Sequence, residues 1–216
     1  MNYAQSIRIL HSLLAVAILL QLAVGELMDV PGMMDAAGEA SLQNSTAFAH
    51  TRHAGVIAPV TAGFEVHEFL GLSIAGLLLI RLLLAFSSIP GAGWRGLFPW
   101  LASDGRKALL SEAATQASGW MKGKLAPPEE GETVARAVHG LMLLTAIGIG
   151  IAGVALFFGW NEHGRQTELM EIVGETHELL VGIFEALLAA HILAVILHQK
   201  QGHNIVARIR PGKSGA

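Results

Sequence analysis

The chain has 216 residues, of which 52% are hydrophobic and only 14% charged, with a mean hydropathy of +0.51 and a net charge of −3. Soluble globular domains carry about 25% charged residues, so this composition excludes an ordinary soluble enzyme and a disordered chain, and the charge gives no indication of nucleic-acid binding. The lack of cysteine excludes disulfides, iron–sulfur clusters, thiolate zinc sites and covalent c-type haem attachment. Ten histidines in so apolar a chain require an explanation.

Four stretches are apolar enough and long enough, at about 20 residues, to cross a membrane. They cover residues 8–25, 64–86, 134–159 and 176–198. Because backbone polar groups inside a bilayer must be satisfied within the segment, each stretch is predicted to be a helix. The predicted fold is an all-α membrane protein, one domain over 1–216 built as a four-transmembrane-helix bundle. A cleaved signal peptide is the alternative for the first span, but the span lacks a small-x-small cleavage site and His11 interrupts its apolar run.

Lysine and arginine are distributed unevenly over the segments between the spans. Twelve of the 14 lie in or beside the N-terminus, the loop at 87–133 and the tail at 199–216. The positive-inside rule then places both termini and the 87–133 loop in the cytoplasm. The loop at 26–63 and the turn before the fourth span face outward, and their acidic residues suit a basic partner. Aromatic residues and leucines scattered through 87–133 predict one or two short helices at the membrane surface.

Four histidines lie near the ends of the predicted spans, at two depths. His11 and His191 lie near the inner ends of the first and fourth spans, and His67 and His177 near the outer ends of the second and fourth. Fourteen residues separate His177 from His191, so both point from one face of the fourth span, about 21 Å apart along its axis. A single interfacial histidine is usually a surface residue, but four at matched depths predict two bis-histidine sites stacked across the bilayer. Iron in a porphyrin takes two axial imidazoles, whereas zinc, the competing metal, needs about four ligands.

Two further ionisable residues within the spans leave their roles open. His139 lies at the inner end of the third span, at the depth of His11 and His191. It could replace His11 as a ligand, or donate a hydrogen bond to a haem propionate or to a quinone. Glu185, in the middle of the fourth span, is either a protonated acid bonded to a neighbouring helix or part of a proton relay.

Three residues have both a cofactor-binding and a purely structural interpretation. Gly71 follows His67 by one turn, where a small residue suits a flat macrocycle but equally suits close helix packing. Arg81 follows His67 by fourteen residues, and Arg8 precedes His11 by three. Each arginine lies at the inner end of a span, where it can pair with a haem propionate or extend into the headgroup region.

Several of these residues form motifs that resemble those of a known family. The motifs are R-x-x-H in the first span (Arg8, His11), H-x-x-x-G followed by R-L-L-L in the second (His67, Gly71, Arg81), H-E followed by a histidine fourteen residues later in the fourth (His177, Glu178, His191), and R-x-x-P-G in the tail (Arg208, Pro211, Gly212). Together they resemble the bacterial cytochrome b561 family, within the wider group that includes the cytochrome b subunits of nickel–iron hydrogenases and formate dehydrogenases.

The resemblance implies a multi-pass protein of the bacterial inner membrane that holds two b haems. It implies an outer haem between His67 and His177 and an inner haem between His11 and His191, the same pairs that the depths give. Family members carry electrons between a periplasmic donor and the quinone pool, and the resemblance implies a quinone site beside the inner haem, close to His191. The two long loops favour a subunit-like member with a periplasmic redox partner or a place in a larger membrane complex.

Three alternative functions remain from the sequence. The first is a proton or solute transporter, although broken helices and inverted halves are missing. The second is a haem-free anchor subunit that positions a soluble enzyme. The third is a self-contained oxidase of a small periplasmic reductant.

Overall fold

The computed structural model describes residues 4–28, 62–89, 92–123, 127, 132–159 and 168–212, and within these ranges every regular element is a helix. Four helices are long: α1 (Gln5–Leu27), α3 (Ala62–Ala85), α6 (Glu132–Gly159) and α7 (Glu168–Lys200). The shorter ones are α4 (Trp94–Leu97), the 3-10 turn η1 (Pro99–Leu101), α5 (Ser103–Met121) and α8 (Ile205–Ile209). The long outward loop predicted at 26–63 lies almost entirely outside the described residues.

All four long helices have the length and hydropathy of membrane spans, so the predicted four-helix membrane bundle with short helices between its spans is confirmed. Three of the predicted spans agree with the helices to within three residues at each end. The fourth helix, α7, starts eight residues earlier than the apolar stretch, at Glu168. Acidic side chains in its first turn, Glu168 and Glu171, stabilise the positive end of the helix dipole, which explains how a helix begins in a polar sequence.

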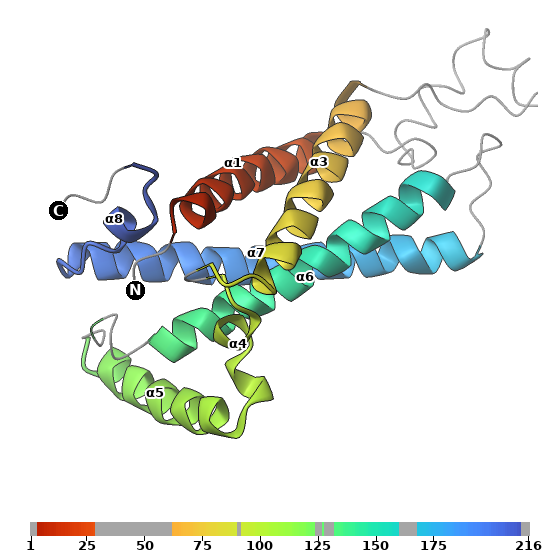
Figure 1. The fold of residues 1–216 in the computed structure, drawn as a ribbon. Coiled ribbons are helices and arrows are strands. Elements are labelled where there is room, and N and C mark those ends of the chain that lie inside the picture. The colour runs from red at the N-terminus through yellow and green to blue at the C-terminus, as the bar shows by residue number, and fades with distance from the viewer. Residues whose placement is uncertain are drawn as a thin grey trace, which may run out of the picture.

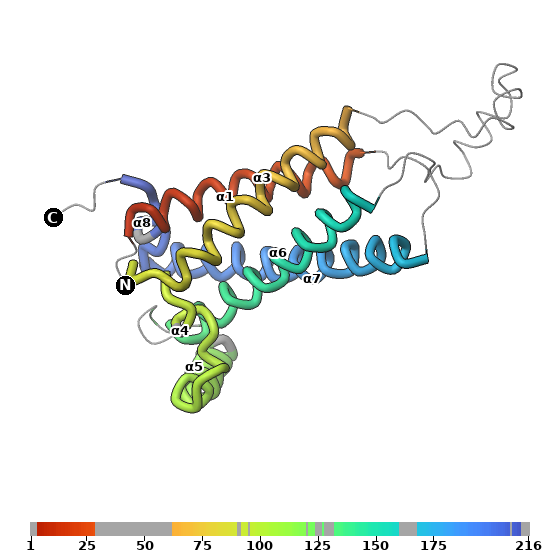
Figure 2. Tube along the Cα trace, turned by 45° about the vertical axis from the view of Figure 1, so that its right-hand side comes forward, coloured from red at the N-terminus to blue at the C-terminus, as the bar shows by residue number. Residues whose placement is uncertain are grey.

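The long helices pack in a chain of neighbours, α1 on α3, α3 on α6 and α6 on α7. Among the described long helices, α7 packs extensively against α6 alone. Figures 1 and 2 show the start of α1 at the same end of the bundle as α4 and α8, and α5 beside the lower part of α6 at that end. Helix α8 contacts both α1 and α7, so the segment after the fourth span folds back across the end of the bundle.

Many large apolar side chains point away from the bundle. Leu13, Leu83, Ile151 and Leu179, one from each long helix, are all more than half exposed. Soluble proteins rarely expose apolar surface on this scale, whereas lipid chains would cover it around a membrane bundle. The outward faces therefore agree with a multi-pass membrane protein.

The buried core is a small apolar cluster in the middle of the bundle. Its members are Ile74 and Leu78 of α3, Leu143 and Ala146 of α6, and Phe184 of α7, with apolar residues of α1 packed against them. Phe184 lies seven residues from both His177 and His191. The cluster thus lies midway between the two depths at which the histidines occur.

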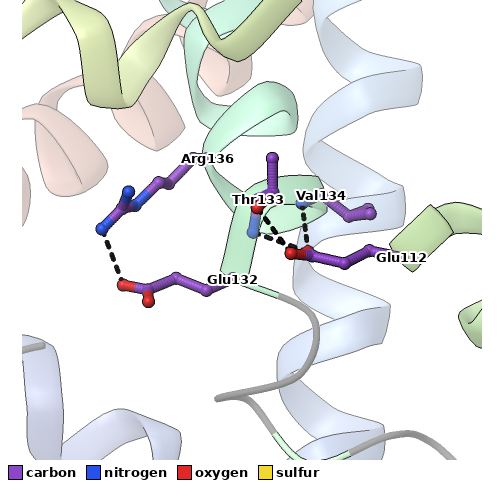
Figure 3. A network of polar contacts seen from close by, with 5 residues as sticks. All are labelled: Glu112, Glu132, Thr133, Val134 and Arg136. Carbon is purple, nitrogen blue, oxygen red and sulfur yellow. Dashed lines mark hydrogen bonds and ion pairs between the residues drawn. The ribbon is translucent and has the colours of Figure 1, made fainter. Parts of the chain in front are cut away.

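The short helices before α6 are held against it at two points. At the first, a Cβ on Gly140 would overlap the backbone carbonyl of Leu97 and touch the ring of Trp100, so only glycine permits this close approach. At the second, the carboxylate of Glu112 in α5 accepts hydrogen bonds from the first turn of α6 (Figure 3): from the Thr133 amide at 2.7 Å, the Val134 amide at 3.2 Å and the Thr133 hydroxyl. Glu112 therefore caps the N-terminus of α6 from another helix.

Replacing Glu112 with alanine is expected to loosen α5 from α6. The loss of a capping carboxylate costs about 1 kcal/mol, which corresponds to about fivefold more frequent opening. The measurement is hydrogen exchange of the amides in the first turn of α6 and in α5. Glu132→Ala is the matched control, because it removes the same charge from a pair with Arg136 (2.9 Å) that is partly exposed to solvent and contributes little. Equal exchange in the two variants would contradict the capping role.

Candidate metal centres

Each of the four long helices places two site residues fourteen positions apart. The pairs are His11 and Gly25 on α1, His67 and Arg81 on α3, His139 and Gly153 on α6, and His177 and His191 on α7. Fourteen residues are nearly four helical turns, so the members of a pair share a face and lie about 21 Å apart. Because the helices alternate in direction, the eight residues form two layers of four, which we call the outer layer (25, 67, 153, 177) and the inner layer (11, 81, 139, 191).

In the outer layer, each of two imidazoles from different helices rests on a glycine of a neighbouring helix. His67 and His177 lie within electrostatic range of each other, although their helices, α3 and α7, do not pack extensively together. A Cβ on Gly25 would lie 3.5 Å from Cε1 of His67, and a Cβ on Gly153 would lie 3.3 Å from Cε1 of His177. The two glycines thus let each imidazole lie close to the backbone of the helix beside it.

Both outer imidazoles carry a buried nitrogen with unused hydrogen-bonding capacity. Among the described residues, Nδ1 of His67 and Nδ1 of His177 are buried and make no hydrogen bond, although the backbone carbonyl of Ile149 lies next to His177. A buried polar nitrogen without a partner costs free energy, and such atoms are rare. A histidine that ligates a metal through Nε2 needs an acceptor for its other ring N–H. The outer layer therefore offers one imidazole from each of two helices as candidate ligands to a porphyrin iron.

The inner layer brings three imidazoles and a guanidinium together. The rings of His139 and His191 meet edge to face, with their centroids 4.9 Å apart and their planes inclined by 65°. His139 also interacts electrostatically with His11 and Arg81, and His191 with His11. The sequence-predicted inner residues thus occupy one site.

The contact between His139 and His191 bears on which histidines would pair. Two axial ligands lie on opposite faces of a porphyrin, separated by the iron and the macrocycle. Rings in edge-to-face contact leave no space for a macrocycle between them. The contact between His139 and His191 is therefore easier to reconcile with His11 than with His139 as the second ligand of an iron beside His191.

Two arginines lie at the inner end of the bundle, as the sequence predicts. Arg81 donates from Nη1 to the carbonyl of Ala92 at 3.1 Å, and Arg8 donates from Nη2 to the carbonyl of Gly212 at 2.9 Å. Within the described part of the chain, Nε of Arg8 is buried and has no partner. Both guanidinium groups anchor the segments that follow the spans, and Arg8 retains a donor for an anionic group such as a propionate.

Gly71 faces α1, because a Cβ on it would lie 3.3 Å from Nε2 of Gln21, the same nitrogen that bonds the backbone of His67. Both the helix-packing and the cofactor-lining interpretations of this glycine agree with that position. Glu185 is partly buried and follows the core residue Phe184 in α7.

Sequence reasoning missed Gln21, Gly25 and Gly153, although all three line the outer layer. Gly25 and Gly153 have a signal in the sequence, since they follow His11 and His139 by the same fourteen residues that separate His177 from His191. Gln21 has no such signal. Its Nε2 donates to the backbone carbonyl of His67 at 3.0 Å, a contact that only the packing of α1 on α3 creates.

The described residues contain no group of three or more histidine, cysteine or acidic side chains arranged to hold a metal ion.

Comparison with known proteins gives one match. The family model described as prokaryotic cytochrome b561 matches residues 2–212. Neither a curated protein nor a solved structure matches the chain.

Proposed function

Since this chain belongs to the prokaryotic cytochrome b561 family, whose model covers nearly its whole length, it is a haem b electron-transfer cytochrome of a membrane, and we propose that it binds two haems, one at each layer. The outer haem is held by His67 and His177 and the inner haem by His11 and His191. Family membership sets aside the transporter and the haem-free anchor, because a cytochrome of this family binds haem b.

The observation that carries the proposal is the pair of outer imidazoles. His67 and His177 come from helices that do not pack extensively together, yet they lie within electrostatic range of each other, and each ring rests on a glycine of a neighbouring helix. Two imidazoles held in this way inside an apolar bundle are costly unless their nitrogens are used. Coordination of one iron through Nε2 of both residues would use them and would leave each Nδ1–H to a carbonyl acceptor.

Bound haem supplies a reversible one-electron couple of iron, and the protein tunes it through ligands, burial and nearby charge. At the outer layer, the glycines hold the ligand rings against the helix backbone. At the inner layer, the guanidinium of Arg81 lies within electrostatic range of His139, and its positive charge favours the form of a nearby haem with one more electron. The positive charge at the inner layer would make the inner haem easier to reduce than the outer one. Electrons would therefore move from the outer layer to the inner one.

We further propose that a quinone is reduced beside the inner layer. His139 contacts His191, and Gly140, next to it, packs against Leu97 and Trp100 of the short helices. His139 is therefore positioned to donate a hydrogen bond to a quinone oxygen or to a haem propionate. The short helices around α4 and η1 would form a wall of the quinone site.

The proposed orientation places the inner layer near the cytoplasm of a bacterial inner membrane. Most lysines and arginines lie at the end of the bundle that carries the start of α1, α5 and α8, which the positive-inside rule assigns to the cytoplasm. The outer layer then faces the periplasm, where a redox partner or a subunit of a larger complex would deliver electrons.

The haem content of the purified full-length protein tests the proposal. A pyridine haemochrome assay against protein concentration is expected to give about two haems per chain, with the reduced spectrum of bis-histidine b-type haem. A ratio of about one would contradict the two-layer proposal. A colourless protein from haem-replete cells would contradict haem binding at both layers.

A further inference from the structure

We propose that Gln21 of α1 is a positioning residue for His67, which holds this ligand in place and supplies the acceptor for its ring N–H. The inference rests on the proposed outer pair, and it concerns a residue that has no role in the mechanism described so far.

The first observation is a direct link between the two helices. Nε2 of Gln21 donates to the backbone carbonyl of His67 at 3.0 Å. The carbonyl of His67 accepts from a side chain of another helix, whereas the carbonyl of Phe69 accepts from Ser73 of α3 itself. Burying a glutamine inside an apolar bundle costs free energy unless its amide makes hydrogen bonds. This contact fixes the position of His67 along the axis of α1.

The second observation is a pair of complementary unsatisfied atoms. Oε1 of Gln21 is a buried acceptor, Nδ1 of His67 is a buried nitrogen, and neither has a hydrogen-bond partner among the described residues. Both belong to residues already joined by the amide contact. Gly25, one turn further along α1, lies against the same ring, since its Cβ would be 3.6 Å from Nδ1 of His67. The ring edge that carries Nδ1 is therefore turned toward α1, the helix that bears Gln21.

Coordination determines the protonation state that this arrangement requires. When Nε2 of a neutral imidazole binds a metal, Nδ1 carries the hydrogen and becomes a donor. In the described part of the chain, Oε1 of Gln21 is an unused buried acceptor on a side chain that already bonds the backbone of His67 through Nε2. It does not bond the ring in this structure, and a change of side-chain torsion on haem binding would bring the two atoms together. A hydrogen bond from Nδ1–H to a carbonyl oxygen makes the imidazole a stronger electron donor, which stabilises oxidised iron and lowers the midpoint potential.

The two ligands of the outer layer would then be held differently. His177 has the backbone carbonyl of Ile149 beside it, which no substitution of a side chain removes. His67 relies on the side chain of Gln21. The midpoint potential of the outer haem would therefore depend on Gln21, a residue that contacts neither the iron nor His177.

The experiment compares Gln21→Met, Gln21→Glu and Thr145→Val in the full-length haem-loaded protein. Methionine keeps the volume but removes both hydrogen bonds, whereas glutamate keeps an acceptor oxygen. Thr145 is a buried polar residue whose hydroxyl bonds only the Leu141 carbonyl of its own helix in the described structure, so its replacement controls for the loss of a buried polar group. The readouts are the midpoint potential of the outer haem, assigned as the wave that His177→Ala removes, and the electron paramagnetic resonance spectrum of the oxidised protein.

We expect Gln21→Met to raise the outer potential and to shift the outer resonance signal, with the inner haem unchanged. Gln21→Glu should return the potential to the wild-type value or below it, and Thr145→Val should leave both haems unchanged. Gln21→Met could instead lose the outer haem. In that case the proposal is supported if Gln21→Glu retains the outer haem, and it is overturned if Gln21→Glu loses the haem to the same extent. The proposal is also overturned if the midpoint potentials of both haems in Gln21→Met equal those of the wild-type protein. Failure of the wild-type protein to hold two haems would instead overturn the proposed function, so the two outcomes are distinguishable.

Discussion

Replacing His177 with alanine is expected to reduce the haem content from about two per chain to about one, because an axial ligand of the outer iron is lost. The remaining haem should keep its bis-histidine spectrum, since the inner layer lies about 21 Å away along α7 and the core cluster around Phe184 separates the two. The measurement is the haem-to-protein ratio together with the reduced-minus-oxidised spectrum of the purified variant.

The partner residue and a distant histidine provide the controls. His67→Ala should reproduce the His177→Ala phenotype, and the double variant should lose no more haem than either single one, because residues that act as one site are not additive. His198→Ala should retain both haems, since His198 lies seven residues beyond His191 and is bonded to His203 (Nδ1 to Nδ1, 2.9 Å). Retention of both haems in His177→Ala would contradict the outer pairing.

At the inner layer, substitutions of three histidines are expected to have unequal effects. His11→Ala and His191→Ala should each remove the inner haem, whereas His139→Leu should keep it. The physical reason is the edge-to-face contact of His139 with His191, at 4.9 Å between ring centroids, which leaves no room for a macrocycle between them. Leucine fills most of the space of the lost ring and avoids a cavity.

The His139→Leu variant also separates ligation from quinone chemistry. With both haems present, its rate of quinone reduction should fall by about 10²- to 10⁴-fold, the usual contribution of one well-placed proton donor, while reduction of the haems by a chemical reductant stays normal. If His139→Leu loses the inner haem and His11→Ala keeps it, then His139 and His191 form the inner pair and the present assignment is wrong.

The sequence predicts the four spans and the two depths of the histidines because both depend on local properties. Hydropathy over about 20 residues identifies a span without knowledge of its neighbours, and a spacing of fourteen residues on one helix fixes a shared face. The start of α7 is the exception. Its first turns contain Glu168, Glu171 and Glu175, so a hydropathy profile cannot distinguish them from a loop, whereas helix propensity and the dipole let the helix extend beyond the apolar stretch.

The features that the sequence did not predict depend on which helices pack together. Gln21 is one polar residue in an apolar span, and its link to His67 exists only because α1 lies on α3. The cap that Glu112 provides is similar, since 21 residues separate it from Thr133. The neighbour of Gly71 is set by the same packing, since a Cβ there would lie 3.3 Å from Nε2 of Gln21.

The apolar cluster between the two layers has a consequence for energy conversion. Ile74, Leu78, Leu143, Ala146 and Phe184 carry no group that can bind a proton, although the partly buried Glu185 follows Phe184 in the chain. An electron that passed between the proposed haems would cross this apolar zone. Each crossing would move one charge with or against the membrane potential, which changes its free energy by about 2.3 kcal/mol per 100 mV. Turnover of the cytochrome would therefore be electrogenic, and its rate would depend on the size of the membrane potential.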